Sequence, residues 1–343
     1  MRLGQRSTEV IMPHTLRIAA LTLLAALLIG GPTPAAFGQA TTPPVVESGV
    51  AASGDFAGLV DIGGRRLYLA CKGSGTPTVI LEAGAGNNGD IWSEVAPEVA
   101  GQSSVFDGVA AFTRVCAYHR PGTIAGSQTI QRSRSDPAPM PRSAGDVVAD
   151  LRALLAAAGV RPPFVLVGHS FGGLVVRLFA STVPPDDVVG LVLVDAAQED
   201  FWTKLKALVT PEQWKDMTSS TPPELADYHD IERLDVDASA AEMHQAADAR
   251  PLRPMPLVVL SRGRPMELSP DSKLPANFSA EQEKIWRDCQ DKLVALVPGA
   301  EHVIATRSGH YIQTTEPNLV IAAVRQVVEA ARMGSLGVTP DHP

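Results

Sequence analysis

The sequence predicts an α/β fold in which a mostly parallel central sheet is covered by helices on both faces. Two observations support this prediction. Short apolar segments of strand length alternate with longer segments whose apolar residues recur at helical spacing. The motif G-x-S-x-G at 168–172 also lies between an apolar strand and a helical segment, the context expected of a strand–turn–helix unit.

The elements can be placed in order along the chain. Gly63-Gly64 separates the first two strands into a β-hairpin. Ser143 and Asp146 have the spacing of a capping box, which predicts a helix start. Strands are expected at 59–62, 66–71, 78–82, 113–118, 164–167, 189–194, 256–261 and 302–306. Helices are expected at 147–158, 171–180, 282–297 and 316–333.

The N-terminal segment has the parts of a secretory signal peptide over 1–40. Three arginines precede an apolar run at 18–29, and Gly38-Gln39-Ala40 has the small-x-small pattern of a cleavage site. The run is short for a bilayer core of about 30 Å, so an uncleaved membrane anchor is the less favoured alternative. We therefore expect a secreted, periplasmic or cell-envelope protein.

The remaining chain divides by composition into a core and an insertion. Residues 41–54 are small and Pro-bearing, as in a linker, and 333–343 are expected to form a disordered tail. Residues 198–253 are charged and lack β-rich runs, which predicts a helical lid insertion. The core then comprises 55–197 and 254–332. Apolar residues of the insertion, such as Phe201, Trp202 and Trp214, could pack on the core or contact substrate.

Composition excludes some classes of protein. A hydrophobic fraction of 45% is sufficient for a large core, so disorder is not expected to be the main state. The net charge of -8 argues against nucleic-acid binding, which requires basic surfaces. No C-x-x-C pair is present, so a zinc or redox site is not expected.

Ser170 is the candidate nucleophile. A sharp turn between strand and helix exposes its hydroxyl in a strained backbone conformation. Side chains at 168 and 172 would collide where helix and strand approach, which explains the two glycines. The helix N-terminus would direct its positive end at charge that forms near Ser170.

The chain resembles the α/β-hydrolase family over about 55–333. The matching motifs are EAGAG at 82–86, AYHRPG at 117–122, GHSFGG at 168–173, LVLVDA at 191–196 and SGHY at 308–311. It is most similar to bacterial exported, lid-bearing serine esterases and hydrolases. The resemblance implies an α/β-hydrolase fold and a Ser-His-acid triad with chain order Ser, acid, His.

His310 is the expected base, because it lies in a glycine-flanked loop after the last strand, where the family carries this residue. His119 is expected to be structural. The side chain of His169, beside the nucleophile, is expected to point away from the pocket.

The acid has two candidates. The commonest family position follows the strand at 256–261, but the loop there has no Asp at the expected offset, and Glu267 comes late. Asp195 directly follows the strand at 189–194, where some family members place the acid. The distance of each residue from the end of the preceding strand favours Asp195 as the acid, and Glu267 remains the alternative.

Two backbone N–H groups are expected to form an oxyanion hole, those of Phe171 and Ala85. The glycines at 84, 86 and 89 also match G-x-G-x-x-G, a dinucleotide-binding pattern. The following strand ends in Tyr118-His119-Arg120 and has no acid for a ribose. We therefore expect no cofactor and no metal.

The resemblance also implies a disulfide. In the family's sheet order, the strands that end at Cys71 and near Cys116 are neighbours, so a Cys71–Cys116 bridge is expected, with two buried thiols as the alternative. Cys289 lies on a helical pattern and is expected to be a packed thiol.

These observations favour an exported serine hydrolase that cleaves an acyl bond, with a carboxylic ester as the expected bond, through an acyl-enzyme. The same triad could act on amides, thioesters or carbon–carbon bonds. Halide and epoxide chemistry is disfavoured because those family members carry Asp at the position of Ser170. A non-catalytic binding protein on this scaffold is a further alternative.

The expected partner is a small-molecule acyl substrate. We expect no nucleic acid and no stable protein partner, and membrane anchoring only if the signal stays uncleaved.

Overall fold

A computed structural model describes residues 45–46, 54–125, 130–219, 225–266, 268 and 273–336. The predicted signal peptide lies outside the described residues, as does the predicted linker apart from 45–46 and Gly54. Among the described residues, no helix has both the length and the hydropathy needed to cross a bilayer.

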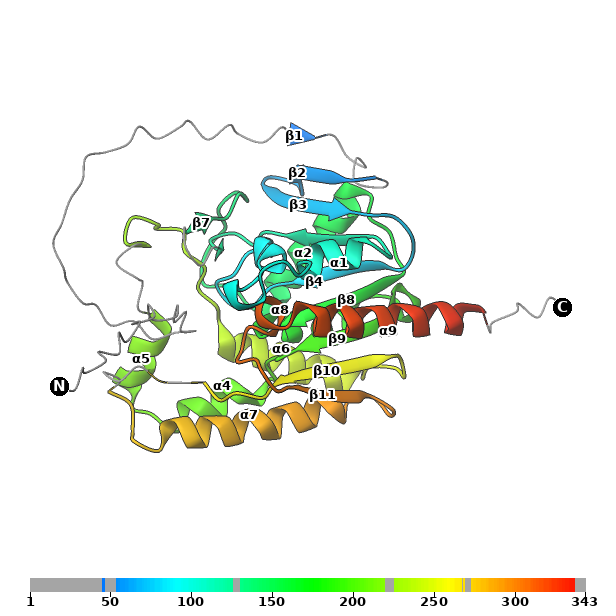
Figure 1. Ribbon diagram of the computed structural model, residues 1–343. Coiled ribbons are helices and arrows are strands. Elements are labelled where there is room, and N and C mark those ends of the chain that lie inside the picture. Colours follow the sequence, from blue (N-terminus) through cyan, green and yellow to red (C-terminus); the bar gives the residue numbers. More distant parts are fainter. Residues whose placement is uncertain are drawn as a thin grey trace, which may run out of the picture.

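In the described part of the chain, nine strands form the central sheet, in the order β1-β2-β3-β5-β4-β8-β9-β10-β11 (Figure 1). Their bounds are β1 Val45–Val46, β2 Phe56–Asp61, β3 Arg66–Lys72, β4 Thr78–Glu82, β5 Val115–Tyr118, β8 Phe164–His169, β9 Val188–Val194, β10 Leu257–Arg262 and β11 Glu301–Ala305. Strands β6 (Ile124–Ala125) and β7 (Gln131–Arg132) form a separate small hairpin. Among the described strand pairs of the main sheet, only β2–β3 and β3–β5 are antiparallel, which confirms the predicted mostly parallel sheet.

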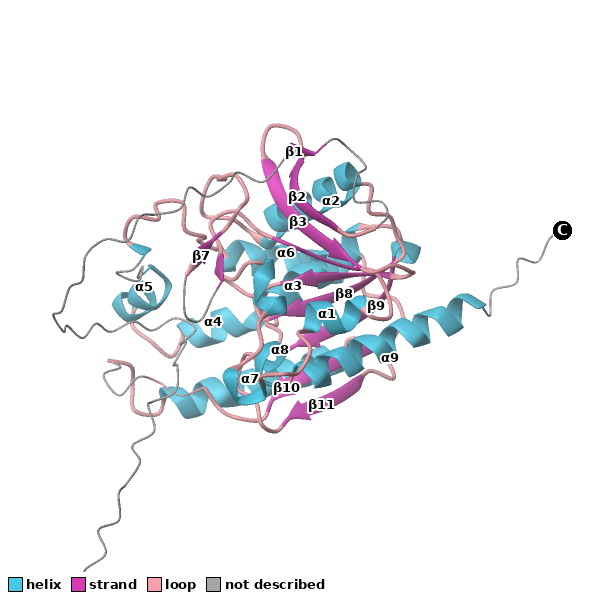
Figure 2. Cartoon of the chain, turned by 45° about the horizontal axis from the view of Figure 1, so that its top comes forward, coloured by secondary structure: helices cyan, strands magenta, loops and turns pink. Residues whose placement is uncertain are grey.

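Helices cover both faces of this sheet (Figures 1 and 2). The α-helices are α1 Val105–Ala110, α2 Ala144–Ala158, α3 Phe171–Thr182, α4 Asp200–Lys206, α5 Pro211–Ser219, α6 Val236–Ala249, α7 Phe278–Val294, α8 Ile312–Thr315 and α9 Pro317–Leu336. Short 3₁₀ helices are η1 Gly89–Ser93, η2 Pro97–Val99 and η3 Pro185–Asp187. Helices α1 and α9 pack together on one face, and α2, α3 and α6 pack together on the other.

The strands bury apolar side chains on both faces, as a parallel sheet between two helical layers requires. Along β8, Leu166 joins the core beneath α2 and α3, whereas Val165 and Val167 join the core beneath α1 and α9. All six residues of β8 are buried. This burial explains the continuous apolar run that the sequence shows there.

Helix α2 begins as its sequence predicts. The Ser143 side chain accepts from the backbone of Asp146, and the Asp146 side chain accepts from the backbone of Ser143, so the capping box is confirmed. Gly159 ends the helix in the left-handed conformation, with φ of +71°.

The predicted insertion at 198–253 contains two structurally different parts. Helices α4 and α5 pack with α7 in a separate apolar cluster that includes Phe201, Leu205 and Trp286. Helix α6 instead packs against α2 and α3, and Met243 belongs to the main core. This part of the insertion therefore belongs to the helical layer of the fold.

The C-terminal helix continues further than predicted. Residues 333–336, placed in a disordered tail on sequence grounds, form the last turn of α9. Just before that turn, Arg332 Nε donates to the carbonyl of Thr76 at 2.8 Å, which holds the helix against the sheet end. Residues 337–343 lie outside the described residues.

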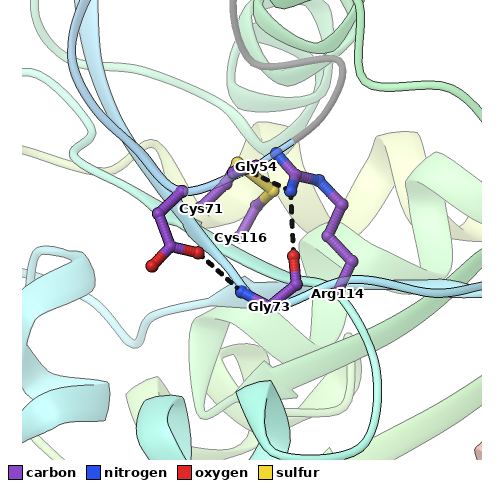
Figure 3. The surroundings of a disulfide bond; sticks show 6 residues. Gly54, Cys71, Gly73, Arg114 and Cys116 are labelled. Atoms are coloured by element: carbon purple, nitrogen blue, oxygen red, sulfur yellow. Dashed lines mark hydrogen bonds between the residues drawn. A yellow bond between two sulfur atoms is a disulfide. The ribbon is translucent and has the colours of Figure 1, made fainter.

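Cys71 and Cys116 form a disulfide between β3 and β5 (Figure 3). The two residues are directly opposite in the antiparallel register of these strands. Beside them, Arg114 Nη1 donates to the carbonyls of Gly54 and Gly73 at 2.7 and 3.1 Å. Cys289 is a buried free thiol.

Loss of the disulfide should destabilise the protein measurably. The cysteines are 45 residues apart, so the chain-entropy model gives a contribution of about 4 kcal/mol. We predict that C71S/C116S lowers the free energy of unfolding in urea by that order, whereas C289S, which makes the same exchange at the free thiol, has a much smaller effect. Equal losses in the two variants would contradict the prediction.

Candidate active site

The turn between β8 and α3 places Ser170 in a strained conformation. Its φ of +52° and ψ of -124° are unusual for a residue with a side chain. A Cβ at Gly168 would lie 2.5 Å from the carbonyl oxygen of Gly172, and a Cβ at Gly172 would lie 2.5 Å from that of Glu82. The turn thus requires glycine at both positions, for the reason the motif suggested.

Neighbouring backbone groups hold this turn. Ser170 N donates to the carbonyl of Val194 on β9 at 3.2 Å. The Ser170 carbonyl accepts from the N–H groups of Gly173 and Ala197 at 2.9 and 2.8 Å. The side chain of Ser170 is partly exposed and lines a cavity at the carboxyl ends of the strands.

His310 and Asp195 form a close pair at this cavity. His310 Nδ1 lies 2.6 Å from Asp195 Oδ2. Asp195 is fully buried at the carboxyl end of β9, with φ of +39°, and His310 follows β11. His310 and Asp195 are distant in sequence but in contact in the fold, and His310 lines the same cavity as Ser170.

Three further donors complete the surroundings of the Asp195 carboxylate. Arg262, the last residue of β10, donates from its backbone N–H to Oδ1 at 3.0 Å and from Nη1 to Oδ2 at 2.9 Å. Trp286 of α7 donates from Nε1 to Oδ1 at 2.8 Å. A carboxylate that accepts several hydrogen bonds is held in a fixed orientation and in its ionised form.

Burial alone would raise the pKa of Asp195, but the hydrogen bond from His310 and the charge of Arg262 outweigh it and lower the pKa to about 2. Because the pKa is depressed in the folded protein, the ionised group stabilises the fold above about pH 4. That stabilisation is lost as the pH falls towards 2.

Arg262 and Trp286 are site residues that no sequence motif indicated. Arg262 is the last residue of β10, near the position where an acid was expected. The sequence offered one signal for this position: no acid stands where the family most often carries it. The alternative acid, Glu267, lies outside the described residues.

His169 was expected to point away from the pocket, and this expectation is wrong. Its ring lines the cavity, and Nε2 donates to the carbonyl of His310 at 2.9 Å. Burial, together with the nearby charge of His310, lowers the pKa of His169 to about 3, so the ring is neutral at ordinary pH. The contact fixes the loop that carries His310.

His119 is buried away from this cavity. Its Nε2 lies 3.2 Å from Asp90 Oδ1, and its Nδ1 accepts from the backbone of Arg134. It has the structural surroundings that the sequence suggested.

The loop after β4 forms another wall of the cavity through Gly84, Ala85 and Asn87. Within the described part of the chain, the backbone N–H groups of Ala85 and Phe171 donate to no other residue. Of the two, Ala85 lines the cavity and Phe171 immediately follows Ser170. The arrangement leaves donors available near the Ser170 hydroxyl.

Apart from Gln282 and Tyr311, the rest of the cavity wall is apolar. It is contributed by α4, α5, α7 and the segment before α7, through Phe201, Trp202, Leu205, Met217, Met266, Leu268, Leu274, Phe278 and Trp286. Among its described lining residues, none is Asp, Glu, Lys or Arg. The surroundings fit an uncharged group.

Two glycines of the G-x-G-x-x-G pattern, Gly84 and Gly89, serve close packing, whereas Gly86 has open space around it and a φ of +71°. A Cβ at Gly89 would lie 2.6 Å from the carbonyl oxygen of Tyr118 on β5, and one at Gly84 would lie 2.8 Å from His169 Nδ1. Over the described ranges, no group of three or more His, Cys, Asp or Glu residues could hold a metal ion.

Comparison with known proteins agrees with this architecture. The family model described as "Alpha/beta hydrolase family" matches residues 79–324. The chain is 27% identical over 265 residues to "Uncharacterized protein YqjL" of Bacillus subtilis (strain 168), covering 76% of this chain and 87% of that protein.

A solved structure shares the fold at low identity. A mutant of haloalkane dehalogenase DatA from Agrobacterium tumefaciens C58 superposes with a TM-score of 0.51 and 15% identity, covering 82% of this chain and 99% of that one. The sheet order, the turn at Ser170 and a family model that spans most of the sequence lead to one conclusion: the chain belongs to the alpha/beta hydrolase family.

Proposed function

We propose that this hydrolase is a serine hydrolase that cleaves carboxylic esters of small, apolar acyl compounds. The observation that supports it most is the meeting of Ser170, the His310–Asp195 pair and the Ala85 N–H at one apolar cavity. Nucleophile, base, orienting acid and oxyanion donor are the four roles that acyl transfer through serine requires.

In the proposed reaction, Ser170 Oγ attacks the ester carbonyl carbon while His310 Nε2 takes the hydroxyl proton. Asp195 holds Nδ1–H and stabilises the imidazolium. The carbonyl oxygen becomes an oxyanion that accepts from the N–H groups of Ala85 and Phe171. Collapse of the intermediate breaks the ester C–O bond, and the leaving alkoxide takes the proton from His310.

The second half of the cycle regenerates the enzyme. Water gives a proton to His310 and attacks the acyl carbon, and collapse of this intermediate returns the proton to Ser170 Oγ. The products are a carboxylic acid and an alcohol, so no redox partner is needed.

The cavity wall supports an uncharged acyl or alcohol group, because it offers apolar surface and no fixed ionic partner among its described residues. Ser170 also argues against halide displacement, which needs a carboxylate at that position.

Export is part of the proposal. The signal-like segment at 1–40 suggests transfer out of the cytoplasm, and a disulfide between Cys71 and Cys116 suits an oxidising compartment.

Ser170 should be indispensable. We expect S170A to lower kcat for p-nitrophenyl butyrate by a factor on the order of 10⁶, and to abolish labelling by a fluorophosphonate probe. Turnover and labelling in purified protein measure both effects. Labelling that persists in S170A would refute the proposed function.

The identity of the acid can be tested by a matched pair. D195N should lower kcat by about 10⁴-fold, because the amide cannot stabilise the imidazolium, whereas E267Q should retain nearly full activity. Steady-state kinetics with the same ester separates the candidates. Loss of activity in E267Q alone would assign the acid to Glu267.

The indole of Trp286 should contribute to the reaction through Asp195. W286F keeps an aromatic ring but loses the N–H that donates to Oδ1, so we expect kcat to fall by about tenfold. W202F is the control, because Trp202 also lines the cavity but its buried Nε1 has no hydrogen-bond partner among the described residues. Equal effects of the two variants would show that pocket shape, not the donor, matters.

A further inference from the structure

A buried ionic cluster lies beneath the loop that carries Ala85. Arg120 follows β5 and is only 2% exposed. Its Nη1 donates to Glu82 Oε1 at 2.6 Å, and its Nε and Nη2 donate to the two carboxylate oxygens of Glu232 at 2.7 and 3.0 Å. The other oxygen of Glu82 accepts from the hydroxyl of Tyr118 at 2.6 Å. The cluster is fully hydrogen-bonded away from solvent, the condition under which buried charges are tolerated.

Arg120 and Glu232 also form hydrogen bonds with the backbone on both sides of Ala85. Arg120 Nη1 donates to the carbonyl of Ala83 at 2.9 Å, and Nη2 donates to that of Gly84 at 2.7 Å. The N–H of Gly86 donates to Glu232 Oε2 at 2.7 Å. All five N–H bonds of the guanidinium are thereby used. Ala85 lies between the held residues and keeps its own N–H available at the cavity.

Glu232 reaches this position from the region predicted as the lid. It belongs to the segment between α5 and α6, more than 140 residues from the loop it holds. Its backbone N–H donates to the carbonyl of Gly122 at 2.8 Å. Arg142 N donates to the carbonyl of Arg233 at 2.9 Å and fixes the segment again one residue later.

Gly122 is required for this contact. With φ of +76°, it brings its chain so close to the segment that a Cβ would lie 2.1 Å from the carbonyl oxygen of Asp230. The insertion is therefore joined to the core at the level of the oxyanion loop, by backbone as well as by charge.

We propose that Glu232 and Arg120 are positioning residues that set the direction of the Ala85 N–H. The inference rests on the proposed function and adds that the insertion, besides lining the pocket, determines how well the oxyanion is stabilised. An oxyanion donor acts only if it is fixed before the charge forms, and a small misplacement is costly. The 83–86 loop has its backbone fixed by Arg120 and Glu232 on both sides of that donor.

The test compares E232Q with E242Q. Glu242 is a matched control, because it also comes from the insertion and binds the core near a helix start. It accepts from the backbone N–H of Gly145 and from the Ser143 hydroxyl, each at 2.7 Å, at the start of α2. In E232Q the amide NH₂ would face the Arg120 or Gly86 donors, so at least one of these hydrogen bonds to the loop is lost. R120K, which keeps the charge but loses the forked donors, is the second variant.

Two measurements decide the outcome. Hydrogen exchange of peptides covering 83–89 should be faster in E232Q and R120K than in wild type, and unchanged in E242Q. Per labelled Ser170, kcat for p-nitrophenyl butyrate should fall on the order of 10- to 100-fold in E232Q and R120K, with KM changed less than about threefold. Normalising to labelled sites removes any fraction that fails to fold.

Unchanged exchange in both variants would overturn the proposal, as would faster exchange with wild-type kcat or a rise in KM alone. A kcat loss of equal size in E242Q would also overturn it. Failure of the proposed function appears differently, as a wild-type protein with neither ester turnover nor Ser170 labelling. In that case the exchange comparison still decides whether Glu232 and Arg120 hold the loop.

Discussion

The active site depends first on the close approach of α3 to β8 and β4 around Ser170. Gly168 and Gly172 leave no room for a Cβ, and the carbonyl oxygens of Glu82 and Gly172 occupy the space that side chains would need. The strained φ of Ser170 follows from this approach. Everything else at the cavity is arranged around a hydroxyl that the turn pushes above the sheet edge: the His310 loop, the carboxyl end of β9 and the loop after β4.

Two buried ionic systems support that arrangement from opposite sides. On one side, Asp195 accepts from His310, Arg262 and Trp286, so its charge and orientation are fixed. On the other side, Arg120 is shared by Glu82 and Glu232 beneath the loop that carries Ala85. In both systems an arginine at or shortly after the end of a core strand uses its planar fork to fix neighbouring groups. Buried charges cost free energy unless they are paired, and in both systems each buried carboxylate lies opposite an arginine.

Much of the fold could be predicted because its signals are local. The strand at 78–82, the capping box of α2 and the glycines around Ser170 each depend on residues close in sequence. The partners of Asp195 could not be predicted, because Arg262 and Trp286 lie 67 and 91 residues away and carry no motif. The role of Glu232 could not be predicted for the same reason, because its partners are distant in sequence and it lies in a charged segment typical of a solvent-exposed surface. The orientation of His169 depends on where the His310 loop passes, which no pattern within β8 specifies.

The most direct test of this mechanism is a crystal structure of the protein after reaction with a small alkyl fluorophosphonate. We predict a covalent bond from Ser170 Oγ to phosphorus, with the phosphoryl oxygen within hydrogen-bond distance of the N–H groups of Ala85 and Phe171. The alkyl group should then lie against the apolar wall formed by α4 and α7. An adduct on another residue, or a phosphoryl oxygen directed away from both N–H groups, would contradict the mechanism.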